Sequence, residues 1–194
     1  MIPAQVIRIG VLGAVFTILT AASPVRGAGD DAELAASILR AVDRPVGLVH
    51  LPRCGNGELA LALLQADDSL RLHGQDADYA NVLAARAAAD ARGLFGRRAW
   101  FDHGPPDRLL PVGRSVDLLV LTDLEAADLT PGLAAEIKRV LHPWYGMAVI
   151  GNAAGRLDVA ALKQWAGRIA RQIKPFPGQA GLVCVTADAL RGSD

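Results

Sequence analysis

The strongest constraint on the fold of this chain lies between Gly47 and Asp76. An apolar run at residues 47–51 has the length of a strand in the core of a sheet. Cys54-Gly55-Asn56-Gly57 follows, and residues 58–64 are strong helix formers. Residues 70–75 then form a second strand that ends at Asp76. A helix between two such strands is typical of neighbouring parallel strands in an α/β sheet.

The two glycines of this turn allow the backbone to bend sharply and to approach a ligand. The free N–H groups at the start of the following helix would point toward that ligand. Asp76 follows Gly57 by 19 residues, near the spacing at which an acidic side chain binds a ribose diol. The segment therefore predicts a bound nucleoside-type cofactor. Two simpler interpretations stay open: an ordinary strand-to-helix turn, and an Asp76 that only caps the helix beginning near Tyr79.

Strands and helices alternate along most of the remaining chain. Helices are expected at residues 32–42, capped by Asp30 and Asp31, and at 79–92, 130–141 and 158–173; strands are expected at 98–101, 116–121, 146–151 and 182–186. A further short strand near residues 172–174 lies too close to the last one for a parallel crossover. The pattern predicts an α/β fold: a mostly parallel sheet with helices on both faces and a C-terminal antiparallel hairpin.

Composition and charge exclude several classes of protein. A chain of 194 residues with 52% hydrophobic and 21% charged residues has enough apolar side chains for one folded domain. Lys+Arg and Asp+Glu both number 20, so no excess of one sign points to nucleic acid or to anionic lipid. No motif selects a substrate or predicts an oligomeric state.

The first 27 residues differ from the rest. A basic residue, Arg8, precedes a short apolar run at residues 11–22, and small residues follow at positions 25 and 27. This order is typical of a secretory signal peptide, and the run is shorter than the roughly 20 residues that span a membrane. The sequence predicts export to the periplasm or the medium, with 28–194 as the remaining domain. An uncleaved membrane anchor is the alternative.

The cysteines and histidines indicate structural roles. Cys54 lies in the glycine turn after the first strand and Cys184 lies in the last strand, and these two strands are not expected to be neighbours, so two free, buried thiols are predicted. No histidine or cysteine spacing indicates a metal site. His50 lies within a core strand and is expected to be a hydrogen-bonded polar group rather than a base.

Four segments, in this order and spacing, resemble the class I S-adenosylmethionine (SAM)-dependent methyltransferases of the small type-11 kind: Cys54-Gly55-Asn56-Gly57, His73-Gly74-Gln75-Asp76, Val116-Asp117-Leu118-Leu119-Val120, and the helix end at residues 136–143. The resemblance implies a Rossmann-like class I methyltransferase fold over residues 28–194. A narrower resemblance is to the methyltransferase-like domain that precedes pyrroloquinoline-quinone (PQQ)-type β-propellers in exported bacterial proteins, since residues 185–194 look like the linker into such a propeller.

The resemblance also implies roles for single residues. The turn of Arg53, Cys54, Gly55, Asn56 and Gly57 would pass beneath the methionine part of SAM. At the ends of the following strands, Asp76 with its neighbour Ala77 would meet the ribose hydroxyls, and Asp102 would lie near the adenine amino group. Thr122, counted with the cofactor-binding residues, and Asp123 would border the substrate. Asp123 is the candidate for the catalytic base, and an exposed turn acid is the alternative for it.

Two residues depart from the family pattern: Leu51 stands where an acid is usual, and Arg53 where a glycine is usual. Together with the predicted export, they favour an alternative, a non-catalytic binding or spacer module on the same fold. A third hypothesis is a nicotinamide-dependent oxidoreductase, because Gly55-x-Gly57-x-x-Ala60 with Asp76 also fits the dinucleotide fingerprint.

Overall fold

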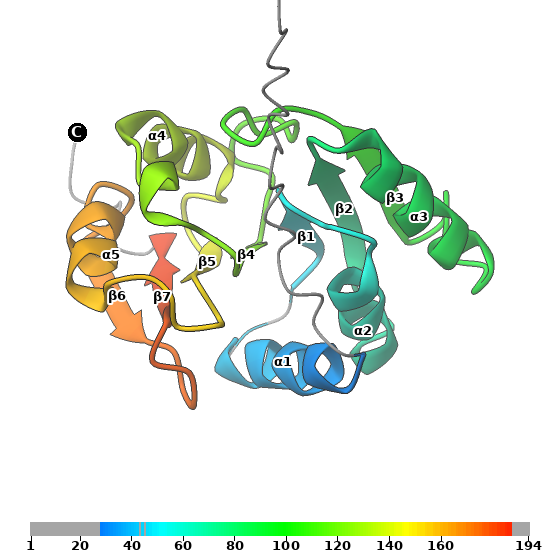
Figure 1. Ribbon diagram of the computed structural model, residues 1–194, viewed down its shortest axis with the longest axis horizontal. Coiled ribbons are helices and arrows are strands. Elements are labelled where there is room, and N and C mark those ends of the chain that lie inside the picture. Colours follow the sequence, from blue (N-terminus) through cyan, green and yellow to red (C-terminus); the bar gives the residue numbers. More distant parts are fainter. Residues whose placement is uncertain (1–27, 43, 45, 188–194) are drawn as a thin grey trace, which may run out of the picture.

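The computed structural model describes residues 28–42, 44 and 46–187 (Figure 1). The predicted signal peptide at residues 1–27 and most of the proposed linker at the C-terminal end lie outside the described residues. Within the described part of the chain, no helix is long and apolar enough to cross a membrane.

The centre of the molecule is a seven-stranded sheet in the order β3-β2-β1-β4-β5-β7-β6. The strands are β1 (Leu48–Leu51), β2 (Arg71–Asp76), β3 (Ala99–His103), β4 (Leu118–Leu121), β5 (Met147–Gly151), β6 (Gln172–Pro175) and β7 (Leu182–Thr186). β1 to β5 are parallel, whereas β7 pairs antiparallel with both β5 and β6. The predicted mostly parallel sheet with a C-terminal hairpin is therefore confirmed.

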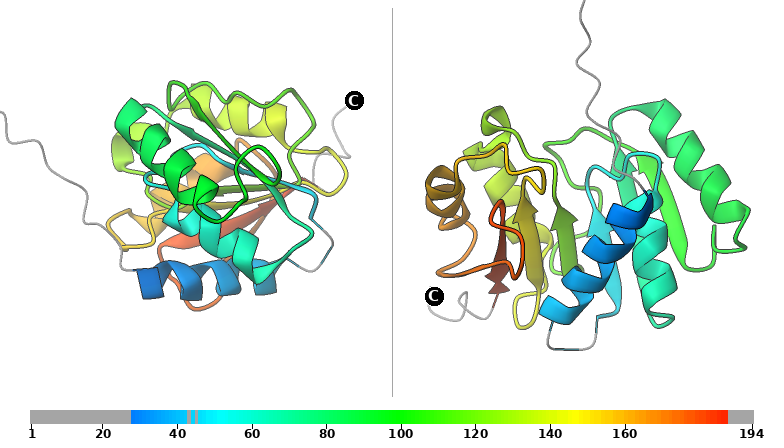
Figure 2. Two further views of the ribbon diagram at one scale, coloured as in Figure 1. Left: turned by 90° about the vertical axis from the view of Figure 1, so that its right-hand side faces the viewer. Right: turned by 60° about the horizontal axis from the view of Figure 1, so that its bottom comes forward.

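Helices cover both faces of this sheet (Figure 2). Helices α1 (Ala28–Ala41), α2 (Glu58–Ala66) and α3 (Tyr79–Asp90) share one apolar core with Leu118 and Val120 of β4. Helices α4 (Pro131–Val140) and α5 (Val159–Ala166) share the other core with Leu119 and Leu121. Because successive side chains of a strand point to opposite faces, this run of four buried residues in β4 contributes to both cores.

Local side-chain hydrogen bonds fix where several elements begin. The Asp117 carboxylate accepts the backbone N–H groups of Gly47 and Leu48 and so joins the start of β1 to that of β4. Thr130 caps α4 by accepting the N–H of Leu133, and Asp158 caps α5 by accepting the N–H of Ala160. These caps satisfy N–H groups that have no partner within the helix.

Three predicted boundaries are wrong. The last helix ends at Ala166 and not at residue 173, because the N–H groups of residues 168 and 169 bond three residues back and residues 172–175 pair with β7. Helix α1 begins at Ala28, so Asp30 and Asp31 lie in its first turn and do not cap it. Strand β3 extends to His103, which places Asp102 inside the strand and not after it.

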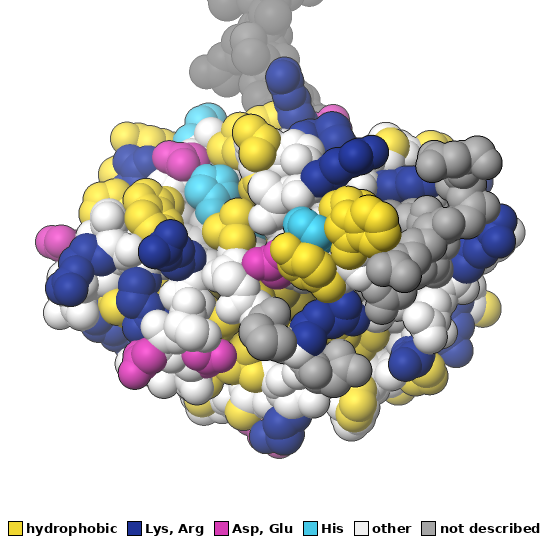
Figure 3. Space-filling view, turned by 180° about the vertical axis from the view of Figure 1, so that it is seen from behind, with side chains coloured by type: hydrophobic (Ala, Val, Ile, Leu, Met, Phe, Trp, Pro, Cys, Tyr) yellow, Lys and Arg dark blue, Asp and Glu magenta, His cyan; other side chains and the backbone are white. Residues whose placement is uncertain are grey.

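The proline-rich segment between β3 and β4 contains loop and turn structure, apart from an isolated bridge between Val116 and Leu141. On the face opposite to that of Figure 1, basic side chains are spread out with apolar and acidic side chains between them (Figure 3). Cys54 and Cys184 are both free and buried, as predicted.

Candidate active site

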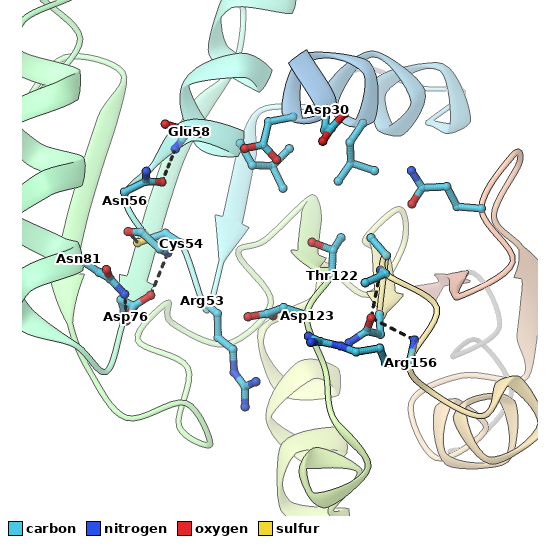
Figure 4. A pocket seen from close by; sticks show the side chains of 18 of the residues that line it. Asp30, Arg53, Cys54, Asn56, Glu58, Asp76, Asn81, Thr122, Asp123 and Arg156 are labelled. Carbon is cyan, nitrogen blue, oxygen red and sulfur yellow. Dashed lines mark hydrogen bonds between the residues drawn. The ribbon is translucent and has the colours of Figure 1, made fainter. Parts of the chain in front are cut away.

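A cleft of about 990 Å³ lies at the carboxyl ends of the parallel strands (Figure 4). Its walls come from the turn after β1, the end of β2, the end of β4, the loop after β5, the β6–β7 turn and the first turns of α1. The strand order reverses between β1 and β4, and ligands of open α/β sheets bind at such a switch point. Of the predicted site residues, Arg53, Cys54, Gly55, Asn56, Asp76, Ala77, Thr122 and Asp123 line the cleft.

The two glycines of the turn serve different purposes. Gly55 has a φ of 53°, and a β-carbon built on it would meet no atom within 4 Å. It therefore leaves open space beside the cleft. Gly57 has a φ of 88°, and its β-carbon would come within 2.9 Å of the Ala85 side chain. Gly57 does not line the cleft; it allows the start of α2 to pack closely against α3.

Asp76 holds the cleft wall together. Its Oδ2 accepts the backbone N–H of Gly55 (2.8 Å), and its Oδ1 accepts the N–H of Asp78 (2.9 Å) and the side-chain amide of Asn81 (3.2 Å). A carboxylate has about four acceptor positions, so one position, on Oδ2, is left for a ligand. The helix cap that was the alternative role for Asp76 belongs to Asp78, which accepts the N–H of Ala80.

Arg53 crosses from the turn after β1 to the segment after β4. Its guanidinium donates to Asp128, in the 3₁₀ turn Ala126–Asp128. Burial lowers the pKa of Arg53, but the hydrogen bond to Asp128 and the charges of Asp123, Asp128 and Asp76 outweigh burial and raise it. Arg53 is therefore a permanent cation that carboxylates already surround.

Asp123 follows β4 and points into the cleft (Figure 4). Asp123 is accessible from the cleft, but the protein atoms near its carboxylate desolvate the charged form and raise its pKa; the charge of Arg53 opposes the rise. Its backbone is held by an isolated bridge to Asn152, at the end of β5. A carboxylate with a raised pKa accepts a proton more readily at neutral pH than an ordinary aspartate does.

Cys54 lines the cleft but is not a reactive thiol. Burial first, and then the charge of Asp76, raises its pKa to about 12. Thiol reactivity requires the thiolate, so Cys54 contributes shape and not nucleophilic chemistry.

Asp102 does not reach the cleft. It accepts hydrogen bonds from Arg86 (3.1 Å) and from Nε2 of His73 (3.0 Å) on the outer part of the sheet. His73 in turn contacts His50, which is fully buried in β1. Nδ1 of His50 must donate to the His73 carbonyl (2.9 Å), because that oxygen can only accept, and Nε2 is left without a partner. His50 is thus hydrogen-bonded as predicted, but only through Nδ1 and not through Nε2.

Several cleft residues have no sequence signal that marks them. Asp30, Asp31 and Glu33 reach the cleft from α1, and Arg156 and Gln179 reach it from the loops after β5 and β6. Arg156 forms an ion pair with Glu125 (2.9 Å). These residues follow no motif, and they meet only because the packing of α1 and of the hairpin brings them to the same edge of the sheet.

The fold is that of known structures at low sequence identity. A SAM-dependent methyltransferase structure from Methanococcus maripaludis matches with a TM-score of 0.65 and 13% identity, over 79% of this chain and 83% of that one. One from Aquifex aeolicus matches with a TM-score of 0.61 and 10% identity, over 84% and 98%. The [4+2]-cyclase SpnF matches with a TM-score of 0.62 and 16% identity, over 78% and 63%.

These matches establish the architecture. The chain has the Rossmann-like fold of the class I methyltransferases, as the sequence predicts. It spans between 46% and 63% of the length of three of the matched structures, SpnF among them. No protein-family model and no curated protein matches the sequence.

Proposed function

We propose that the protein is a SAM-dependent methyltransferase. The observation that carries the proposal is the cleft at the switch point of a class I methyltransferase sheet, where the turn around Gly55 and the end of β2 at Asp76 meet. Solved methyltransferases with this fold support SAM as the cofactor.

The residues present fit the two ends of such a cofactor. The open space beside Gly55 leaves room for the methionine part next to the turn, and the remaining acceptor position of Asp76 suits one ribose hydroxyl. SAM supplies an electrophilic methyl group on a sulfonium. The protein then contributes positioning and exclusion of water, and Asp123 is the group that accepts a proton from the methyl acceptor.

Calorimetric titration of the purified protein with SAM tests this proposal. We expect micromolar binding at neutral pH, and no heat with NADH, which the dinucleotide hypothesis would require. A folded sample that binds NADH and not SAM would replace the methyltransferase with an oxidoreductase. A folded sample that binds neither SAM nor NADH at millimolar concentration would indicate a non-catalytic scaffold on the same fold.

Two contacts favour a second candidate, a non-catalytic binding or spacer module on this fold. Asp76 uses three of its acceptor positions within the protein, which leaves too few for both hydroxyls of a ribose. Arg53 stands where related turns have glycine and is held by Asp128. Methyl transfer to any acceptor, measured with radiolabelled SAM, distinguishes the two candidates.

We further propose that the protein is exported. The pattern of residues 1–27 supports this location. The narrower resemblance to the domain that precedes PQQ-type propellers is proposed on residues 185–194, which look like the linker into such a propeller. Amino-terminal sequencing of the protein recovered from the expressing cells tests it. A mature chain that begins near Ala28 is expected; a chain that keeps residues 1–27 in the membrane fraction would support the anchor instead.

A further inference from the structure

We propose that the protein docks on an anionic phospholipid surface through the edge of the sheet that lies opposite the cleft. Docking of this kind goes beyond methyl transfer and does not depend on the cofactor. Two features of this edge indicate such a partner: basic side chains without counter-ions, and exposed apolar side chains between them.

The amino ends of strands β1 to β5 form the edge opposite the cleft, which lies at their carboxyl ends. Strand β6 runs in the same direction as β5, because both pair antiparallel with β7. We define the amino edge as the chain that leads into these strands, from the last three residues of the preceding helix to the first residue of the strand, with a loop segment before β4. It comprises residues 39–48, 64–71, 88–99, 112–118, 138–147 and 164–172.

The amino edge has an excess of positive charge. Among its described residues, eleven basic side chains stand against four acidic ones, and three of the four acids already have partners. Asp117 accepts backbone N–H groups at the start of β1. Asp67 accepts from Ser69, and Asp68 pairs with Arg98. Over the whole chain, basic and acidic residues both number 20, so the equal totals conceal this separation of charge.

Seven of the basic side chains are exposed and form no hydrogen bond or ion pair within the described chain. They are Arg71, Arg92, Arg97, Arg114, Lys138, Arg168 and Arg171. A cation in the last turn of a helix is explained by the helix dipole, but only Lys138 lies in such a turn. The other six lie in connections or, for Arg71, at the start of a strand. They are available to an external anion.

These cations extend across the whole width of the sheet. Arg97 precedes β3 at one side of the strand order, and Arg171 precedes β6 at the other. Seven neighbouring strands span roughly 30 Å. One small anion does not reach charges so far apart, whereas a lipid leaflet presents phosphate groups over the whole distance.

Exposed apolar side chains lie at the middle of the amino edge. Trp144 and Tyr145, 55% and 42% exposed, precede β5, and Val112, 74% exposed, precedes β4. These two strands are paired, and β4 is the central strand of the sheet. His142 stacks on the Tyr145 ring with 3.5 Å between centroids and so supports it. Figure 3 looks onto this side, where dark blue basic side chains are frequent around apolar ones.

The apolar side chains favour lipid over nucleic acid. Trp and Tyr partition to the membrane–water interface, where the ring meets acyl chains and its polar atom stays hydrated. An exposed valine has no polar group for a phosphate or a base edge, but it gains from contact with acyl chains. A protein docked in this way keeps its cleft, on the other edge of the sheet, open to solvent.

Sedimentation with lipid vesicles tests the proposal on the protein purified from expressing cells. The probes are vesicles of phosphatidylcholine alone and of phosphatidylcholine with roughly 30% phosphatidylglycerol, at about 0.1 M and about 1 M salt. At the lower salt we expect binding to the phosphatidylglycerol vesicles to be stronger by about tenfold or more. The preference should disappear at the higher salt, where charges are screened within ~3 Å.

Matched variants assign the binding to the amino edge. The double variant Arg114→Gln with Lys138→Gln should weaken binding to phosphatidylglycerol vesicles about tenfold. Its control, Arg108→Gln with Lys174→Gln, removes two exposed cations outside the amino edge and should change binding by less than about twofold. All variants keep the same amino terminus, so residues 1–27, if retained, contribute equally to each.

A second pair of variants tests the apolar contribution. Trp144→Ala should weaken binding to the same vesicles about fivefold. Tyr79→Ala removes an aromatic ring of similar exposure, 53%, at the start of α3 near the cleft edge, and should leave lipid binding unchanged. Thermal unfolding of each variant checks that it is folded.

Equal binding to the two kinds of vesicle overturns the proposal, and so does an equal loss in the double variant and its control. Tighter binding to a short duplex DNA than to phosphatidylglycerol vesicles at the same salt would replace the lipid by nucleic acid. SAM affinity measured by calorimetry should be unchanged in the amino-edge variants. If SAM binds to none of the folded proteins while the lipid preference holds, the methyltransferase proposal fails and the docking surface stands.

Discussion

Protonation of His50 should destabilise the protein in mild acid. Its side chain is fully buried in β1, and burial, followed by the charge of His73, lowers its pKa from 6.5 to about 3. The unfolded chain therefore binds a proton between pH 6.5 and 3 that the folded chain does not. Stability from the neutral imidazole is complete above pH 6.5 and decreases as the pH falls below that value.

The size of this loss of stability follows from the lowered pKa of His50. At pH 5 the unfolded imidazole is about 1.5 pH units below its pKa while the folded one stays neutral, and at ~1.36 kcal/mol per unit this amounts to about 2 kcal/mol. His50→Asn retains a donor for the His73 carbonyl but does not titrate. His103→Asn, which changes an exposed histidine, is the control.

Denaturant unfolding followed by circular dichroism at pH 7 and pH 5 measures the difference. Between these values, wild type and His103→Asn should each lose about 2 kcal/mol more of unfolding free energy than His50→Asn. An equal loss in all three proteins would show that His50 is not held neutral in the folded state.

Three substitutions test the turn and the cleft. Asp76→Ala should abolish SAM binding detected by calorimetry and, because the Gly55 N–H loses its acceptor, reduce stability by about 1–3 kcal/mol; unchanged SAM affinity would refute the assignment of this residue. Gly57→Ala should cost about 2–4 kcal/mol in thermal unfolding, because of its positive φ and the contact with Ala85, whereas Gly55→Ala should cost about 1 kcal/mol; equal losses would contradict the packing role. Arg53→Gln removes a cation near the expected sulfonium and should tighten SAM binding roughly fivefold; weaker binding would mean that Arg53 binds the cofactor carboxylate.

Much of the fold could be predicted because local patterns determine it. The buried run of β4 and the periodic apolar positions of α4 identify their elements from neighbouring residues alone. The end of α5 could not be predicted in this way, since apolar residues continue at helical spacing up to residue 173. Pairing with β7 over residues 172–175 decides that boundary, and pairing between distant segments leaves no local signal.

Part of the candidate site could be predicted in the same way. The turn around Gly55 and the end of β2 at Asp76 meet, as expected for consecutive parallel strands, because the carboxyl ends of such strands share one edge of the sheet. The same reasoning placed Asp102 at that edge, but its strand continues for one more residue and its carboxylate faces His73 and Arg86. A difference of one position in a strand turns a side chain to the other face.

The sequence by itself thus determined the class of fold, the position of the glycine turn and the two strand ends that border the cleft, because each depends on residues close together in the chain. Only the tertiary structure decided the character of the cleft. The acids of α1 and Gln179 line one cleft although they lie far apart in the sequence, and the ion pair of Arg53 with Asp128 joins two further distant segments. Charge and hydrogen bonding act through space, and those distances exist only once the helices and the hairpin have packed.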